Sequence, residues 1–167
     1  DAKFCGVCGA KLPDPNLGRV IGQRYVLREL IGSGTLGDVY RAEQLGLQRK
    51  LAIKLLPADP QRDQRTVERF RREGAIFCKL RSPHTVTSYE FDTEPDGSLY
   101  IAMELSPGRS LADIFRGEGP LEPARVLRII AGLCDSLGEA HQLGVVHRDL
   151  RPSNILIEKC SASRDFV

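Results

Sequence analysis

Apolar residues alternate with polar ones, or run together, in five stretches of the first two thirds of the chain. These stretches predict β-strands, because β-branched and aromatic residues favour strands and turn residues separate the runs. They cover residues 25–31, 38–42, 50–56, 85–91 and 99–103. Between the third and fourth strands, residues 59–80 predict a helix, since Asp59 and Pro60 are typical of a helix start.

Helical periodicity replaces this pattern in the last third of the chain. A short helix is predicted over residues 110–115 and a longer one over residues 123–142. Apolar positions of the longer helix recur every three or four residues and predict an amphipathic helix with one stripe: Val126, Ile130, Leu133, Leu137 and His141. A short apolar strand is predicted over residues 155–157.

Composition and charge exclude several classes of protein. The 167 residues suffice for one domain with a core, or for a small lobe and part of another. The net charge is +2 with both signs interleaved, which argues against a nucleic-acid or membrane-surface partner. No apolar run is long enough to span a bilayer. The chain begins at Asp1 without an initiator methionine, so we expect it to be a piece of a longer protein.

Cysteine usage indicates a reducing compartment and one candidate metal site. Five cysteines with a single close pair do not form a disulfide framework, which favours a cytoplasmic location. That pair, Cys5 and Cys8 in residues 1–12, has the spacing of two zinc ligands, but a zinc site needs four. The two interpretations are half of a zinc ribbon, with an incomplete site, and a metal-free tail. Residues 13–23 are predicted to be a linker.

A glycine-rich turn joins the first two predicted strands. Gly32, Gly34 and Gly37 follow the pattern Gly-x-Gly-x-x-Gly-x-Val, which lets backbone N–H groups approach phosphate oxygens closely. The competing dinucleotide-binding pattern requires a helix after the turn, whereas a strand follows here. An ordinary hairpin turn is the other alternative.

Lys54 and Glu73 are a candidate ion pair. Lys54 interrupts an apolar strand, and Glu73 falls between Phe70 and Phe77 on the apolar stripe of the predicted helix. A carboxylate on a buried face needs a partner, and Lys54 lies on the sheet that this helix must cover. The alternative is an exposed glutamate at the rim of the helix.

The stretch from His147 to Asn154 combines residue types suited to phosphoryl transfer. Asp149 is placed to accept or orient the proton of an attacking hydroxyl group. Arg151 can neutralise phosphate charge, and Asn154 can bind Mg²⁺. His147 and Arg148 are expected to hold the loop.

With these motifs in this order, residues 24–167 resemble the first part of a eukaryotic-type protein kinase, bacterial Ser/Thr branch. The resemblance implies an α+β fold: a five-stranded antiparallel small lobe with one main helix over residues 24–104. A hinge and the start of a mainly helical large lobe follow over residues 105–167. It also implies ATP and Mg²⁺ as cofactors and a protein serine or threonine as the phosphate acceptor.

The same resemblance implies roles for individual residues. Catalytic roles fall to Lys54, Glu73, Asp149 and Arg151, and Asn154 is the Mg²⁺ ligand. The residues implied to bind the nucleotide are Ile31, Gly32, Ser33, Gly34, Gly37, Val39, Ala52, Lys54, Met103, Glu104 and Ser106.

Two departures from the family pattern keep a second interpretation open. Arg151 stands where Ser/Thr kinases usually have lysine, and a planar guanidinium differs from a compact ammonium. No Asp-Phe-Gly follows the loop, since Asp165-Phe166 is followed by Val167. We therefore expect a kinase fragment with little or no activity alone, in which the stripe from Val126 to Leu137 is left exposed. One alternative is a pseudokinase or nucleotide-binding scaffold. The other is a small-molecule kinase of related fold, and Pro152 argues against that one.

Overall fold

The computed structural model describes residues 8, 13–34, 37–59, 63–159 and 165–166. The side chains of Glu73, Lys159, Asp165 and Phe166 lie outside this description. The chain divides into two units, residues 1–74 with 89–105 and residues 75–88 with 106–167. Each unit is described by itself.

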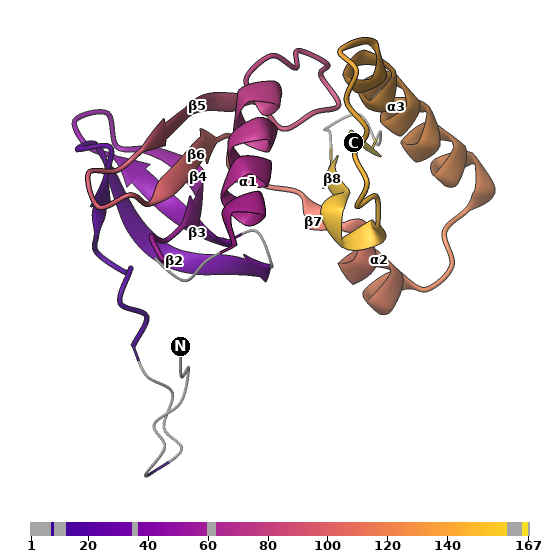
Figure 1. Cartoon of the computed structure of the whole chain (residues 1–167). Helices are drawn as coiled ribbons and strands as arrows, with labels where there is room; N and C mark the ends of the chain where they lie inside the picture. Colours follow the sequence, from indigo (N-terminus) through magenta and orange to yellow (C-terminus); the bar gives the residue numbers. More distant parts are fainter. Residues whose placement is uncertain (1–7, 9–12, 35–36, 60–62, 160–164, 167) are drawn as a thin grey trace. The chain divides into compact units, whose positions relative to one another are not determined.

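A six-stranded sheet forms the first unit (Figure 1). Its strands follow one another in the order β1 (Val20–Ile21), β2 (Tyr25–Gly34), β3 (Gly37–Gln44), β4 (Arg49–Leu56), β6 (Leu99–Met103) and β5 (Ser88–Thr93). The pairs from β1 to β6 are antiparallel. The α+β fold is confirmed, with β1 as a strand beyond the five expected. A strand of two residues leaves too little alternation to be found by pattern.

Alternation along β4 determines what each face of the sheet carries. Leu51, Ile53 and Leu55 are buried in a core cluster that also contains the rings of Tyr40 and Tyr100. Side chains alternate along a strand, so Ala52 and Lys54 occupy the opposite face.

Helix α1 (Gln64–Phe77) packs against β5 through Phe70, which lies in the middle of the helix. The ring of Phe70 is fully buried and lies 6.2 Å from the ring of Phe91 on β5. The helix begins later than the predicted Asp59. In the first turn of the helix, the backbone N–H of Arg65 donates a hydrogen bond of 3.2 Å to the carboxylate of Asp63.

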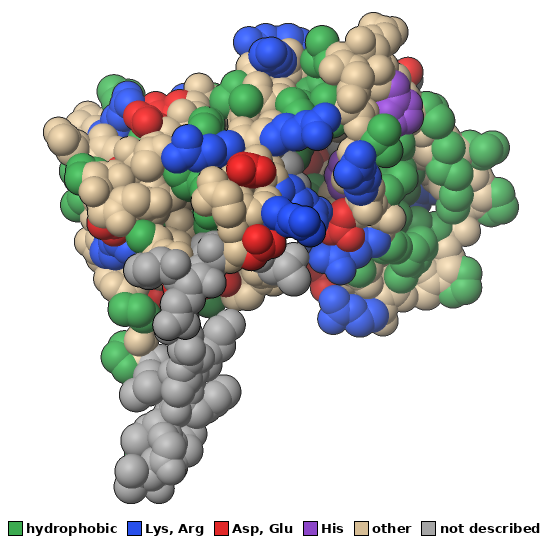
Figure 2. Space-filling model, in the orientation of Figure 1, with side chains coloured by type: hydrophobic (Ala, Val, Ile, Leu, Met, Phe, Trp, Pro, Cys, Tyr) green, Lys and Arg blue, Asp and Glu red, His purple; other side chains and the backbone are tan. Residues whose placement is uncertain are grey.

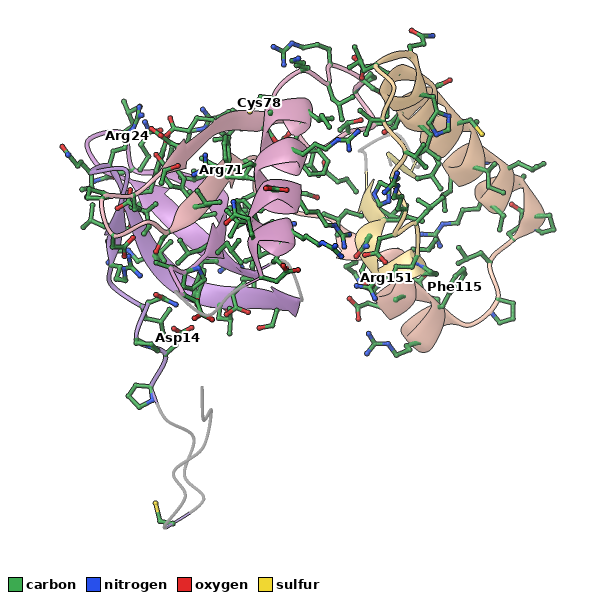
Figure 3. All side chains as sticks on the ribbon, viewed as in Figure 1. Asp14, Arg24, Arg71, Cys78, Phe115 and Arg151 are labelled. Carbon is green, nitrogen blue, oxygen red and sulfur yellow. The ribbon has the colours of Figure 1, made fainter. Side chains whose placement is uncertain are left out.

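The predicted linker range, residues 13–23, is hydrogen-bonded to the sheet. Asp14 (Figure 3) accepts a hydrogen bond of 2.9 Å from the hydroxyl of Tyr40, and Asn16 donates to the same hydroxyl at 3.1 Å. Burial raises the pKa of Tyr40 to about 12. Arg19 forms an ion pair of 2.8 Å with Asp96. We refer to residues 14–19 as the N-terminal clasp.

The second unit joins helices to a small sheet. Its elements are β7 (Arg109–Ser110), α2 (Leu111–Glu118), α3 (Pro123–Gln142), the 3₁₀ turn η1 (Pro152–Asn154), β8 (Leu156–Lys159) and β9 (Asp165–Phe166). The sheet has the order β7-β8-β9. Ser110 caps α2 by accepting from the N–H of Asp113, and Glu122 caps α3. The core of the unit consists of Leu111, Ile114, Ile129, Ile155 and Ile157.

Helix α3 has the predicted bounds, and its apolar stripe from Val126 to Leu137 is only partly buried. Its buried positions are Ile129, Gly132 and Ala140, whereas Ile130 is 47% exposed and His141 is also exposed. The helix carries apolar residues on more than one side, so periodicity alone could not select the core face. Figure 2 shows hydrophobic side chains at the surface of this helical unit.

Candidate functional site

In the first unit, strand register brings five of the eleven predicted nucleotide-binding residues onto one face of the sheet. Val39 of β3 pairs with Gly32 of β2 and with Lys54 of β4. Ala52, two residues before Lys54, pairs with Met103 at the end of β6. Residues that pair directly across strands share a face. The five positions therefore form a continuous surface, opposite to the face that carries Leu51, Ile53 and Leu55.

The glycine-rich turn closes one edge of this surface. Ser33 pairs with Asp38, and Gly34 pairs with Gly37, while the residues between them lie outside the described part. Gly37 has φ +100°, and a Cβ there would overlap the carbonyl group of Leu55. Only glycine combines this backbone conformation with so close an approach. Strand β3 thus lies close to β4 at this point without a side chain in the way.

Lys54 reaches toward α1 from this face. Its side chain is partly buried, and its Nζ lies 5.7 Å from the centre of the Phe70 ring. Glu73 lies in the same helix, but its side chain is outside the described residues, so the pair with Lys54 stays a prediction. The neighbouring Arg71, labelled in Figure 3, and Arg72 are exposed.

In the second unit, Asp149 lies between the side chains of Arg151 and Asn154. The Nδ2 group of Asn154 donates to a carboxylate oxygen of Asp149 at 2.9 Å and to its backbone oxygen at 2.9 Å. The Nε atom of Arg151 (Figure 3) lies 3.5 Å from the other carboxylate oxygen. The structure therefore brings together the three residues of this loop to which the sequence assigns chemistry.

Local backbone features hold this loop. Arg148 adopts a left-handed conformation with φ +61°, and the imidazole Nδ1 of His147 accepts from the N–H of Asp149 at 3.3 Å. The buried Ile155 and Ile157 anchor the chain just after η1. His147 and Arg148 thus lie where a loop-holding role, as predicted, requires them.

The donor set of the loop fits Mg²⁺. Because Nδ2 of Asn154 is engaged with Asp149, the Oδ1 atom of Asn154 is the one that can face a cation. Mg²⁺ binds oxygen ligands, and the Asp149 carboxylate, which accepts from Nδ2 of the same amide group, adds negative charge to the loop. The Asp149 side chain is 51% exposed, so a substrate hydroxyl can reach it.

The remaining predicted contacts are distributed over both units. Ile31 and Glu104 are exposed in the first unit. Ser106 belongs to the second unit, where its Oγ accepts from the N–H of Gly108 at 3.0 Å. Gly108 carries no functional prediction, but a Cβ there would lie 2.9 Å from the carbonyl oxygen of Ile157.

No structural finding bears on the predicted zinc site. Cys8 is exposed and free, and Cys5 lies outside the described residues. Among the residues that the structure describes, no three His, Cys, Asp or Glu side chains are grouped to hold a metal ion. Within the same residues, no helix has the length and apolar character needed to cross a membrane.

Two contacts of the site could not be predicted from the sequence. The bond between Asn154 and Asp149 depends on the turn of the chain through η1, and the only signal for it is their spacing. The second involves Glu139, whose carboxylate binds the backbone of Arg81 and Ser82. A single acidic residue on a helix carries no sequence signal for such a role.

Comparisons with known proteins agree with this geometry. The family described as "Protein kinase domain" matches residues 25–164. Serine/threonine-protein kinase pkn3 of Myxococcus xanthus is 40% identical over 154 residues, which cover 92% of this chain and 28% of that protein. Serine/threonine-protein kinase PknB of Mycolicibacterium smegmatis is 42% identical over 146 residues, which cover 85% of this chain and 23% of that protein.

Solved structures show the same fold. The crystal structure of the Mycobacterium tuberculosis PknI kinase domain superimposes with a TM-score of 0.72 at 28% sequence identity. The match covers 89% of this chain and 60% of that one. The chain thus spans roughly a quarter of the length of the curated relatives, 28% of pkn3 and 23% of PknB.

Proposed function

Because this chain belongs to the protein kinase family, we propose that the intact protein is an ATP-dependent protein serine/threonine kinase. The proposal extends beyond the chain itself, which spans 28% of pkn3 and 23% of PknB. The observation that carries it is the Asp149 carboxylate held between Arg151 and Asn154 in the second unit.

In the proposed reaction Asp149 accepts the proton of the substrate hydroxyl as the phosphoryl group is transferred. The hydrogen bond from Asn154 and the charge of Arg151 orient the carboxylate for that task. Arg151 also offers a guanidinium to the charge of the transferred group. Asn154 holds Mg²⁺ through Oδ1. The exposure of the loop supports a macromolecular acceptor.

The first unit contributes nucleotide binding in this proposal. Bound ATP supplies the phosphoryl group, and Mg²⁺ neutralises its negative charge. Val39, Ala52 and Met103 present apolar surface for the base, and Ile31 and Glu104 complete its surroundings in this unit. Ser106 is the proposed contact from the second unit. The backbone around Gly32, Ser33, Gly34 and Gly37 approaches the phosphates. Lys54 anchors the phosphates and is held by Glu73. The shared face of the sheet supports this assignment.

Arg151 favours a second candidate function, a pseudokinase or nucleotide-binding scaffold. A planar guanidinium lies 3.5 Å from Asp149 where a compact lysine is usual in the family, so phosphate could be bound without transfer. The two functions differ in one observable property, since only the kinase phosphorylates a protein.

We further propose that Cys5 and Cys8 provide two ligands of a zinc site in the intact protein. We also propose a cytoplasmic location. Five cysteines with a single close pair do not form a disulfide framework, which supports a reducing compartment.

Substitution of Lys54 tests the enzymatic proposal. In the intact protein, Lys54→Met removes the phosphate anchor, and we expect transfer to a generic basic protein to fall by about a hundredfold or more. The measurement is incorporation of labelled γ-phosphate. Lys50→Met is the matched control, because Lys50 is an exposed lysine of the same strand, outside the site. Full activity of Lys54→Met would rule out the assignment.

A further inference from the structure

A row of side chains crosses three strands of the first unit, on the face opposite to the predicted nucleotide surface. Tyr25 of β2 pairs with Gln44 of β3, and Gln44 pairs with Arg49 of β4. Directly paired residues share a face, and Leu51, two residues after Arg49, lies on that face as well. Lys54 is an odd number of positions away from Arg49 along the same strand, so it occupies the other face. The row is therefore separate from the residues proposed to bind ATP.

A cavity of about 150 Å³ lies over this row. Its lining consists of the four residues of the row and of Tyr89, which comes from β5, and all five belong to the first unit. Tyr25 and Leu51 are buried, whereas Arg49 and Tyr89 are exposed. The cavity thus has a buried base and an opening beside the arginine, and it has room for several water molecules or a small organic group. We call it the Arg49 cavity, defined by these five lining residues.

The polar side chains of the Arg49 cavity offer hydrogen-bond donors. The guanidinium of Arg49 lies 4.2 Å from the centre of the Tyr89 ring, and its Nη2 donates to the Tyr89 hydroxyl. This bond uses one of the five N–H groups of arginine and leaves the phenol's own O–H to donate. The amide of Gln44 adds a further N–H donor, and none of the five lining residues is acidic. Such a lining favours a negatively charged acceptor.

The charge of Arg49 is not balanced within the described part of the chain. No acidic side chain among these residues forms an ion pair with it. The other arginines in or directly before strands β2–β4 pair with carboxylates at distances between 2.9 and 3.1 Å: Arg28 with Glu43, Arg41 with Glu29, and Arg24 (Figure 3) with Glu90. The Arg49 cavity therefore carries one uncompensated positive charge.

We propose that the Arg49 cavity binds a small carboxylic acid. The planar guanidinium fork matches the two oxygens of a carboxylate, and the apolar body of the ligand lies on Leu51 and on the ring of Tyr25. A single uncompensated charge favours a carboxylate over a phosphate monoester, which carries about −1.5 to −2 at pH 7. A free acid and the carboxyl terminus of a peptide present this same chemistry. The inference goes beyond the proposed kinase function and does not depend on it.

Binding of butyrate to the intact protein tests this inference, with saturation-transfer NMR as the measurement. Arg49→Gln should weaken butyrate binding by about tenfold or more, because the charge-assisted hydrogen bonds are lost. Arg49→Lys keeps the charge without the fork and should bind with intermediate affinity. Lys50→Gln is the matched control, since Lys50 is an exposed cation next along β4, on the other face, and its loss should leave binding unchanged.

Two further ligands identify what is bound and where. Butyramide, the neutral analogue of butyrate, should bind wild type about tenfold more weakly. Saturating ATP should change the affinity for butyrate by less than about twofold, because the two sites lie on opposite faces of the sheet. Competition by ATP would place butyrate in the nucleotide site and overturn the proposal.

The dipeptide acetyl-Ala-Leu, with a free or an amidated carboxyl group, distinguishes the two sources of the carboxylate. If the free dipeptide binds more tightly than butyrate, and loses affinity in Arg49→Gln, the ligand is a peptide terminus; if it binds more weakly, the ligand is a free acid. Absence of binding of both butyrate and the dipeptide to wild type would refute the site. So would equal affinities of wild type and Arg49→Gln, or an equal loss of affinity in Lys50→Gln.

Discussion

Gly74 shows how packing can reverse a helix propensity at a single residue. Glycine inside a helix costs about 1 kcal/mol relative to alanine, so the sequence alone makes Gly74 a weak point of α1. In the structure Gly74 is buried, and a Cβ at this position would overlap the ring of Phe91. The same ring packs against Phe70, which is fully buried. The glycine therefore makes room for an aromatic side chain.

We predict that Gly74→Ala destabilises the protein. Overpacking against Phe91 should lower the free energy of unfolding by about 1–3 kcal/mol, although propensity alone predicts a gain. Denaturant unfolding measures the effect. The control is Gly138→Ala in α3, where nothing lies within 4 Å of an added Cβ, and this variant should be stabilised. Stabilisation of both variants would contradict the packing account.

The sequence assigned chemistry to residues of the loop from His147 to Asn154, but it could not specify their contacts. Spacing alone assigned chemistry to Asp149, Arg151 and Asn154. The hydrogen bond between Asn154 and Asp149 requires the left-handed backbone of Arg148 and the η1 turn, which no propensity specifies for a non-glycine residue. The side-chain contacts within such a loop therefore cannot be predicted from residue spacing.

At the scale of elements, the start of α3 depends on one carboxylate. Glu122 accepts from the N–H groups of Ala124 at 2.9 Å and Arg125 at 3.0 Å, and Pro123 occupies the first helical turn. The hydrogen bond from Ala124, followed by that from Arg125, lowers the pKa of Glu122 below its ordinary value. The ionised carboxylate is thus the capping form.

This cap should make the stability of α3 depend on pH. Because the folded-state pKa is lowered, the contribution of Glu122 is present above the unfolded pKa of about 4.3 and is lost as the pH falls through the folded value. Glu122→Ala should lower the melting temperature by a few degrees at pH 7 and by much less near pH 3. Thermal unfolding at the two pH values measures the difference. An equal loss at both would contradict the capping role.

Elements with strong local signals could be predicted, and elements held by tertiary contacts could not. The bounds of α3 match the prediction because Pro123 and a long apolar period mark them. Its buried face could not be selected from the periodicity, since Ile129 is buried and the neighbouring Ile130 is exposed. The contacts of the N-terminal clasp could not be predicted, because its bonds to Tyr40 and Asp96 join residues distant in sequence.

At the scale of the whole molecule, alternation in the strands predicted which side chains share a face but not how the strands align. Pairing of Val39 with Lys54, and of Ala52 with Met103, depends on hairpin lengths and on irregularities in β2. The predicted nucleotide residues of the first unit thus form a surface that only the register reveals.

The second unit exposes large apolar side chains, as the sequence led us to expect for the helix over residues 123–142. Leu127 is 68% exposed, and Val146 of the following segment is 61% exposed. Exposed apolar patches of this kind favour association with other surfaces. Activity measurements therefore belong with the intact protein.

Replacement of the proposed base, Asp149→Asn, tests the central claim most directly. The variant keeps the size of the side chain and the backbone oxygen that Asn154 binds, but it cannot accept the substrate proton. In the intact protein with Mg²⁺ and ATP, the account predicts that wild type phosphorylates serine or threonine in a protein substrate. It further predicts that kcat falls by a factor of about 10²–10⁴ in Asp149→Asn, while ATP affinity changes less than about twofold.

Asp92→Asn is the control: it changes an exposed aspartate of β5 and should behave as wild type. Equal phosphate transfer by wild type and Asp149→Asn, or ATP binding without any transfer by wild type, would contradict the account.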